Sequence, residues 1–249
     1  AGYATLKTGK WWEGDSHEWG FDKSNKDYGF LDVNIGRKTM EPVYDFIAGT
    51  QGQGKPFFIW LAIHIPHSNH NGAPADIQQY WQDRWSKGNG WKYMAMITWL
   101  DRVIGELNAF LTINGLAQDT LIAFLADNGA GLQPSKGSFS EGGLRSPLQL
   151  YFPGTILPQV REELVSSVDL FPTMLDYAGL PTSSACSDKI SLKALLEGTI
   201  QGRQELTTVK SGGEIRAVRD TRFKSYFKSG KPVARYDLLL DPFEKKNLR

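Results

Sequence analysis

An aspartate and an asparagine stand where the chain could hold a metal ion. Asp127-Asn128-Gly129 follows directly on the apolar run 121–126, which is typical of a buried strand. Ligands of open parallel sheets bind beyond the carboxyl ends of the strands, and Asp and Asn oxygens are hard donors suited to calcium or magnesium. The same tripeptide is also a good turn sequence, so these residues alone leave a metal site and a plain turn both open.

A histidine and a lysine are placed in a comparable way nearer the start of the chain. Pro66-His67 follows the apolar run 57–63, and a histidine there could protonate a leaving group or bind an anionic ester. Lys10 follows Gly9, which would let the backbone approach a ligand closely, and its ammonium group suits an oxyanion such as sulfate or phosphate. A Gly-Lys pair is also common in surface turns with a solvated amine.

Two further histidines, His64 and His70, lie three residues on either side of His67. Such a trio could suggest zinc. However, no cysteine lies nearby and a proline interrupts the spacing, which argues against a zinc site.

Strands alternating with helices must position these side chains. Apolar runs predict strands, and apolar residues at helical spacing predict helices. The strands are expected over 56–63, 120–126 and 147–152, and the helices over 93–111 and 167–177. Strands separated by helices indicate an α/β fold with a mostly parallel sheet sandwiched by helices.

The end of the chain has a different pattern. Two strand-like stretches, 222–228 and 234–240, flank a Ser229-Gly230 turn, as in an antiparallel hairpin. We therefore predict an α/β domain over residues 1–202 and a small antiparallel sheet subdomain over residues 203–249, with the boundary near Gly202.

Composition limits the possible partners. The 249 residues are 41% hydrophobic and 22% charged, with a net charge of +1, which favours neither a nucleic acid nor a membrane surface as a partner. Cys186 is the single cysteine, so an internal disulfide framework is excluded. The longest apolar stretch, Phe57 to Ile65, is too short to span a bilayer.

Several segments, in order through nearly the whole chain, resemble the sulfatases, a branch of the alkaline phosphatase superfamily. They are 2–11, Pro66-His67, 116–129, 133–137, 140–147, 215–224 and 236–248. The segments 9–14 and 35–40 are similar to a subgroup known from marine bacteria. The resemblance implies an alkaline-phosphatase-like α/β fold, with a small antiparallel sheet at the C-terminal end.

The resemblance also implies a reaction and its residues. A formylglycine would attack the sulfur of a sulfate ester, while Lys10 and Lys136 hold the sulfuryl oxygens and His67 helps the alcohol leave. Asp127 and Asn128 would supply two calcium ligands. The substrate would be a sulfate ester or a sulfated sugar, and the location periplasmic or extracellular. Glu141 and Arg145 are expected in an internal ion pair or in helix-end interactions.

The chain departs from the family pattern at the nucleophile. The family converts the Cys or Ser of a Cys/Ser-x-Pro-x-Arg motif to formylglycine, and neither Cys186 nor any serine begins such a motif here. Two aspartates that complete the calcium site in the family are also missing. We therefore expect the N-terminal segment with the formylglycine motif to be absent, the calcium site to be incomplete and the chain to be inactive alone. Exposed sheet edges would then invite association.

Two other functions remain open at this stage. One is a non-catalytic or degenerate fragment that binds sulfate or a sulfated glycan. The other is a phosphatase or phosphodiesterase of the same superfamily, which would need further Asp and His ligands for two zinc ions. Only four histidines occur in the chain, which disfavours this second alternative.

Overall fold

The computed structural model describes residues 2–67, 70–85, 87–129, 136–182, 188–210 and 212–249. The chain forms two compact units, Ala1–Leu116 and Ala117–Arg249. Within the described ranges, no helix is long and apolar enough to cross a membrane.

The first unit is built on a parallel sheet of three strands in the order β2-β1-β3. Its strands are β1 (Ala4–Gly9), β2 (Lys23–Ser24) and β3 (Phe57–Ala62). The strand predicted over 56–63 is thus confirmed as β3, paired with β1 from Ala4↔Phe57 to Gly9↔Ala62. Because the two strands are parallel and in register, their carboxyl ends lie at the same edge of the sheet.

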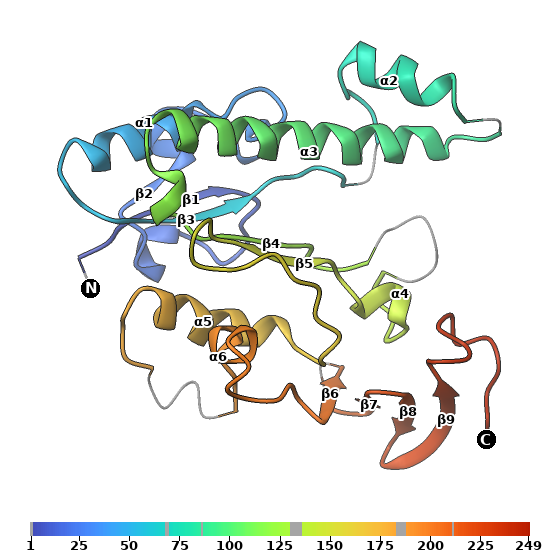
Figure 1. Ribbon diagram of the computed structural model, residues 1–249. Coiled ribbons are helices and arrows are strands. Elements are labelled where there is room, and N and C mark those ends of the chain that lie inside the picture. The colour runs from blue at the N-terminus through green and yellow to red at the C-terminus, as the bar shows by residue number, and fades with distance from the viewer. Residues whose placement is uncertain (1, 68–69, 86, 130–135, 183–187, 211) are drawn as a thin grey trace. The chain divides into compact units, whose positions relative to one another are not determined.

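Helices α1 and α3 run across one face of this sheet, with α2 beyond them (Figure 1). Their bounds are α1 (Glu41–Gln51), α2 (Ala75–Gln82) and α3 (Gly90–Ile113). Tyr44 of α1 stacks on Phe110 of α3, with ring centroids 4.4 Å apart. The predicted helix over 93–111 is confirmed as α3, and Gly115 follows it with a φ of 71°, a left-handed conformation that suits glycine.

β3 is an edge strand of the three-stranded sheet, and one of its faces is only partly covered. Phe58 and Trp60 point to the same face and are 39% and 47% exposed. Phe21 stacks on Phe58 at 6.2 Å between ring centroids. The sequence predicts a fully buried strand here, whereas Phe58 and Trp60 leave one face of β3 partly exposed.

The second unit begins with two strands, β4 (Ile122–Leu125) and β5 (Leu148–Tyr151). They pair antiparallel, whereas the alternating pattern predicts parallel neighbours. The reason is the connection, which carries the one-turn helix α4 (Glu141–Leu144) beyond the carboxyl end of β4. The chain re-enters the sheet from that end instead of crossing back over its face. Helices α5 (Leu170–Tyr177) and α6 (Leu192–Leu196) follow.

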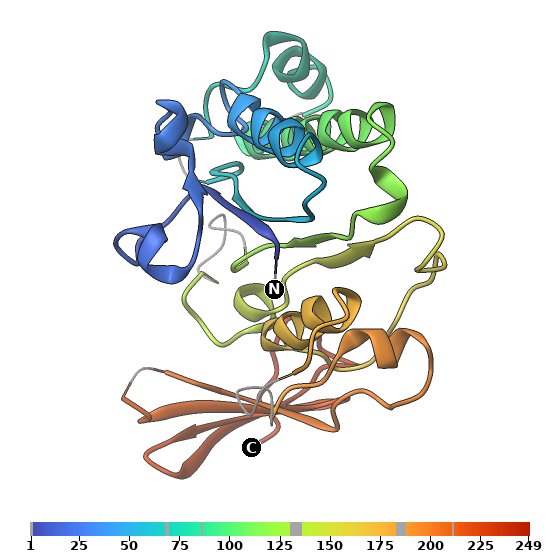
Figure 2. The same cartoon turned by 90° about the vertical axis from the view of Figure 1, so that its left-hand side faces the viewer.

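The second unit ends in a four-stranded antiparallel sheet, β6-β7-β8-β9, whose strands are foreshortened in Figure 1 and seen along their length in Figure 2. The strands are β6 (Glu205–Val209), β7 (Ile215–Asp220), β8 (Phe223–Lys228) and β9 (Lys231–Asp237). Ser229 and Gly230 both have positive φ values, as a two-residue hairpin turn requires. The predicted hairpin is confirmed, and β9 starts earlier than expected because Lys231 pairs directly with Lys228. The predicted domain boundary near Gly202 stays a prediction.

Candidate functional site

The Gly9-Lys10 turn is fixed by β3 and by a buried asparagine. Gly9 has a φ of 76°, and a Cβ atom there would lie 2.0 Å from the Ala62 carbonyl oxygen. The Lys10 N–H donates to that oxygen at 2.7 Å, and the Gly9 N–H donates to Oδ1 of the fully buried Asn25 at 3.3 Å. Only glycine combines this φ with so close an approach, so Gly9 sets where Lys10 leaves the sheet.

His67 leaves the neighbouring strand at the same edge. After β3 ends at Ala62, the Ile65-Pro66 peptide bond is cis, and the His67 N–H donates to the His64 carbonyl at 2.9 Å. His67 is exposed, while His64 is half-buried. The structure therefore brings the predicted residues Lys10 and His67 to one edge of the β2-β1-β3 sheet. His70 lies edge-on to Tyr93, with ring centroids 5.2 Å apart.

Arg37 also lies at this turn, although the sequence prediction did not include it among the site residues. Its Nη2 donates to the His64 carbonyl at 3.4 Å, the same oxygen that accepts from the His67 N–H. Its Nη1 donates to the Asn71 carbonyl at 3.5 Å, and its Cζ atom lies 6.0 Å from the centroid of the Trp99 ring. Its only earlier signal was its place in the segment 35–40.

The pKa of His64 is shifted by several charged and titratable groups around it. Burial lowers the pKa of this imidazole, and the positive charges of Lys10 and Arg37 and the presence of His67 lower it further. Asp32 acts in the opposite direction, but its carboxylate is bound to the buried Lys7 at 2.8 Å. Lys10, Arg37 and His67 thus lie within electrostatic reach of one imidazole, which makes this edge suited to an anion.

In the second unit, the Asp127-Asn128-Gly129 turn rests directly on α4. The Gly129 N–H donates to the Gly143 carbonyl at 3.0 Å, and a Cβ atom on Gly129 would lie 1.6 Å from the Gly142 carbonyl oxygen. Asn128 Nδ2 donates to the Gly129 carbonyl at 2.9 Å, so its amide oxygen remains an acceptor. Asp127 is exposed and Asn128 half-buried. This turn could present one carboxylate and one amide oxygen to a cation.

A buried cluster of charges anchors α4 to the antiparallel sheet. Lys224 of β8, only 1% exposed, donates to Glu141 at 3.0 Å and to Glu244 at 3.2 Å. Arg219 of β7 donates to the other Glu141 oxygen at 2.9 Å, and the Glu141 N–H donates to Glu244 at 2.6 Å. Glu141 therefore forms internal ion pairs, as the sequence analysis expects, with partners on β7 and β8.

The tyrosine beside this cluster is bonded to it as well. The Tyr226 hydroxyl donates to Glu244 and lies 3.0 Å from the Phe139 carbonyl oxygen. Burial, followed by the hydrogen bond to Glu244, raises the pKa of Tyr226. The cluster thus holds both α4 and the segment before it.

The remaining predicted residues belong to the second unit or lie outside the described ranges. Lys136 is exposed and sits in a turn with Gly137, whose φ is 79°. The residues 133–135 that precede it in its motif lie outside the described residues, and so does Cys186. That Lys136, Asp127 and Asn128 converge with Lys10 and His67 stays a prediction.

The donors that a calcium ion would meet are of the right kind but too few. Calcium takes six to eight oxygen ligands, and Asp127 with Asn128 supplies two side chains. Across the parts of the chain that the structure describes, no group of three or more His, Cys, Asp or Glu residues could hold a metal ion. Asp127 and Asn128 by themselves therefore do not make a calcium site.

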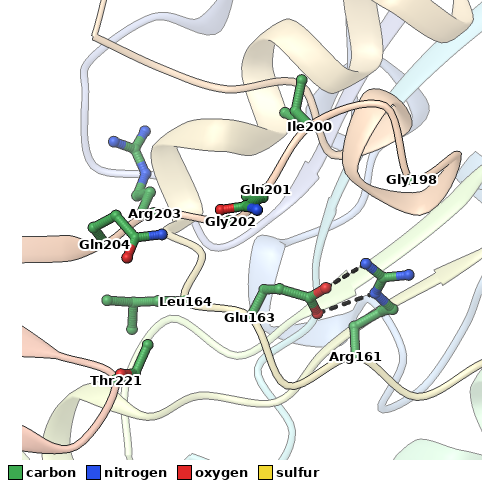
Figure 3. A pocket seen from close by; sticks show the side chains of 10 residues that line it. All are labelled: Arg161, Glu163, Leu164, Gly198, Ile200, Gln201, Gly202, Arg203, Gln204 and Thr221. Atoms are coloured by element: carbon green, nitrogen blue, oxygen red, sulfur yellow. Dashed lines mark hydrogen bonds and ion pairs between the residues drawn. The ribbon is translucent and has the colours of Figure 1, made fainter.

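A pocket of about 370 Å³ in the second unit, drawn in Figure 3, is lined by none of the five predicted residues. Its two arginines already have carboxylate partners. Arg161 pairs with Glu163, and Arg203 donates to the buried Asp169 at 3.0 Å. Since both cations are neutralised by protein groups, this pocket is poorly suited to an anionic ligand.

The sequence is similar to one family of proteins over most of its length. The family model described as Sulfatase matches residues 1–180. Human arylsulfatase A is 32% identical over 248 aligned residues, which cover 84% of this chain. The same alignment covers 47% of the human protein, so the chain spans about half the length of that relative.

Two solved structures have the same fold. Ps i-CgsB in complex with k-i-k-neocarrahexaose matches 99% of this chain and 67% of its own, with a TM-score of 0.77 at 20% identity. A protein solved with its substrate D-glucosamine-2-N,6-O-disulfate matches 99% of this chain and 75% of its own, with a TM-score of 0.69 at 19% identity. These likenesses show the alkaline-phosphatase-like α/β fold and confirm the predicted fold class.

Proposed function

Because this chain belongs to the sulfatase family, we propose that it carries the substrate-binding part of a sulfuric ester hydrolase. One observation carries the proposal most directly. Lys10 and His67 leave the in-register parallel strands β1 and β3 at the same edge, beyond Gly9 and Ala62. A cation and an imidazole at the same end of a sheet suit an ester whose charged group must be held while its alcohol departs.

The residues divide the work by their chemistry. The ammonium groups of Lys10 and Lys136 bind the sulfuryl oxygens and stabilise the charge that builds on them in the transition state. His67 gives a proton to the bridging oxygen as the bond from sulfur to that oxygen breaks, so that a neutral alcohol leaves. Neither role requires a covalent bond to this part of the protein.

In this proposal, the chain supplies only part of the coordination sphere of a calcium ion. When bound, it would neutralise charge on the sulfuryl group, and Asp127 with Asn128 would hold one side of it. The other ligands must come from elsewhere, because two side chains cannot fill its coordination sphere. We therefore propose that this chain alone binds calcium weakly or not at all.

The nucleophile is proposed to lie outside these residues. Covalent catalysis needs an activated nucleophile, and no Cys/Ser-x-Pro-x-Arg motif occurs in the 249 residues. The chain alone is then inactive, and it works either as part of a complete enzyme or as a binding fragment for sulfated glycans.

The proposed substrate is a sulfated sugar, handled in the periplasm or outside the cell. The substrate proposal is supported by the D-glucosamine-2-N,6-O-disulfate named as the substrate of one structural relative and by the k-i-k-neocarrahexaose bound by the other. β3 is an edge strand of the β2-β1-β3 sheet, and its outer side is the proposed place where a further strand associates.

The experiment compares the chain alone with the chain joined to the residues that its gene encodes upstream. Both are assayed with a chromogenic aryl sulfate and with sulfated sugars, together with Lys10→Ala and His67→Ala variants and the exposed Lys55→Ala as a matched control. We expect the chain alone to show no turnover and the extended chain to be active. Lys10→Ala and His67→Ala should each reduce the turnover of the extended chain by about 100-fold or more. Turnover by the chain alone would contradict the proposal, and so would full activity of the two variants. An inactive extended chain that still binds sulfated sugars would favour the binding fragment.

A further inference from the structure

Arg37 is a half-buried cation that has no acidic partner among the described residues. Among the residues that the structure describes, no carboxylate lies within ion-pair distance of its guanidinium group. Its two hydrogen bonds go to neutral carbonyl oxygens at 3.4 and 3.5 Å, and the buried Nε has no partner in the described part of the chain. Burial alone lowers the pKa of Arg37.

Other cations in comparable surroundings are compensated. Lys7 is bound to Asp32 at 2.8 Å, Arg203 to Asp169, and Lys224 to two glutamates. Removing a cation from water is unfavourable unless an opposite charge or several hydrogen bonds replace the lost hydration. The guanidinium of Arg37 has five donors in a planar fork, and most of them meet no acceptor within the described ranges. Such a group is stabilised when an anion binds.

Arg37 lies close to the residues that are proposed to bind the sulfate ester, so an anion bound to it would be part of the same ligand. The His64 carbonyl accepts from both Arg37 and the His67 backbone, so the guanidinium lies directly beside the turn that carries His67. Lys10 is close enough to act on the same imidazole of His64. The face of Trp99 lies 6.0 Å from Arg37 Cζ and helps to fix the plane of the group.

We propose that Arg37 binds a second acidic group of the substrate while Lys10 and His67 hold the sulfate ester that is cleaved. The inference rests on the proposed function and narrows it to sugars that carry two acidic groups, the second being a sulfate or a carboxylate. A planar guanidinium binds either group with two parallel hydrogen bonds, which a lysine cannot do. Arg37 is then a residue that determines substrate specificity, separate from the reacting atoms.

The test is a calorimetric titration of the chain at constant ionic strength with three sugars. They are glucosamine 6-O-sulfate, glucosamine-2-N,6-O-disulfate and a monosulfated disaccharide that contains a uronic acid. Arg37→Gln should weaken binding of the doubly acidic sugars by about tenfold or more and change binding of the monosulfate by less than about twofold. Arg37→Lys should recover part of the affinity. Loss with only one of the two doubly acidic sugars would identify the acidic group that Arg37 binds.

Lys38→Gln is the matched control, because it removes the same charge from the exposed neighbouring residue. It should change every affinity by less than about twofold. The inference is overturned if Arg37→Gln weakens the binding of all three sugars equally or of none of them. It is also overturned if Arg37→Gln changes the affinities no more than Lys38→Gln does.

Failure of the proposed function gives a different result. If Lys10→Gln leaves the monosulfate affinity unchanged, the proposed sulfate site is wrong. Arg37 is examined independently through the NMR signal of its Nε–H during titration with inorganic sulfate, with chloride replacing sulfate to keep ionic strength fixed. A saturable shift supports anion binding at Arg37, and an unchanged signal overturns it.

Discussion

Two places in the molecule, one in each unit, treat buried charge in opposite ways. In the second unit, Lys224 is almost fully buried between Glu141 and Glu244, and each charge has a partner within about 3 Å. In the first unit, Arg37 and His64 have buried nitrogens without hydrogen-bond partners in the described residues. Both arrangements lie beside a turn that carries predicted site residues.

The difference distinguishes a cluster of charges that stabilises the fold from a cation that is suited to bind a ligand. A compensated cluster has no electrostatic reason to bind anything else, and its role is to hold α4 under the Asp127-Asn128-Gly129 turn. An uncompensated cation lowers its free energy when an anion arrives, so the same cost that reduces the stability of the free protein favours binding. A substitution should therefore lower stability strongly at the first place and not lower it at the second.

The largest expected effect is at the compensated cluster. Lys224→Met leaves Glu141 and Glu244 buried close together without the lysine between them, and should lower the free energy of unfolding by about 3–5 kcal/mol. Urea denaturation measures this loss. Lys228→Met, on the same strand with an exposed ion pair at 3.8 Å, should change stability by no more than about 0.5 kcal/mol. Equal effects of the two substitutions would show that the cluster is not special.

The counterpart in the first unit is Arg37→Gln. Because no carboxylate loses its partner, the substitution should leave the free energy of unfolding unchanged or raise it by up to about 1 kcal/mol. The same urea measurement applies, with Lys38→Gln beside it. A loss above about 2 kcal/mol would mean that Arg37 is held by protein contacts as firmly as Lys224, and the comparison between the units would fail.

An intermediate effect is expected at the turn that places Lys10. Gly9→Ala should destabilise the protein by about 2–4 kcal/mol, because the left-handed backbone and the contact with the Ala62 oxygen both oppose a Cβ atom. Gly14→Ala separates the two causes, since Gly14 has a φ of 79° but no atom within 4 Å of the added carbon. That control should lose only about 1–2 kcal/mol. Thermal and urea unfolding of both variants would reveal whether the close approach matters.

The smallest effect is a pH dependence of opposite sign at two histidines of the first unit. Burial and the neighbouring cations lower the pKa of His64, so the unfolded chain binds its proton more readily than the folded chain. Its contribution to stability therefore falls as pH drops through the ordinary value of about 6.5 toward the folded value. The hydrogen bond to Asp15 raises the pKa of His17, so its contribution is present at acid pH and is lost as pH rises through the folded value.

Thermal midpoints of His64→Asn and His17→Asn between about pH 5 and pH 8 would check these signs. Relative to the parent protein, the thermal midpoint of His64→Asn should be raised at acid pH, and that of His17→Asn should be lowered there. The double variant His64→Asn/Arg37→Gln should have a thermal midpoint at acid pH little higher than that of His64→Asn alone, because each substitution removes the same repulsion between the two positive charges. Parallel curves for all proteins would contradict the assigned causes.

The sequence predicted the main elements where local signals were strong. The apolar run 56–63 became β3, the helical spacing over 93–111 became α3, and Ser229-Gly230 became the turn between β8 and β9. The antiparallel pairing of β4 with β5 was not predictable in this way. It depends on how the long connection between them folds, and no periodicity within the strands reports that.

For the site, the sequence could place Lys10 and His67 at strand ends, and the structure puts those ends at one sheet edge. It could not identify Arg37, because the lack of an acidic partner is a property of the folded surroundings. Lys224 alternates with Phe223 and Tyr226 like an ordinary half-buried strand residue. Its burial arises from contacts with residues far away in the chain, which local patterns do not contain.

That distance also bears on the order in which the second unit folds. Glu141 lies 83 residues from Lys224, and its N–H bonds to a glutamate 103 residues away. By contrast, β8 and β9 are joined by a two-residue turn. Loop closure favours the short-range hairpin first, and contacts across long separations form later. A chain arrested between these steps would already have its antiparallel hairpin, while α4 was not yet bound to β7 and β8.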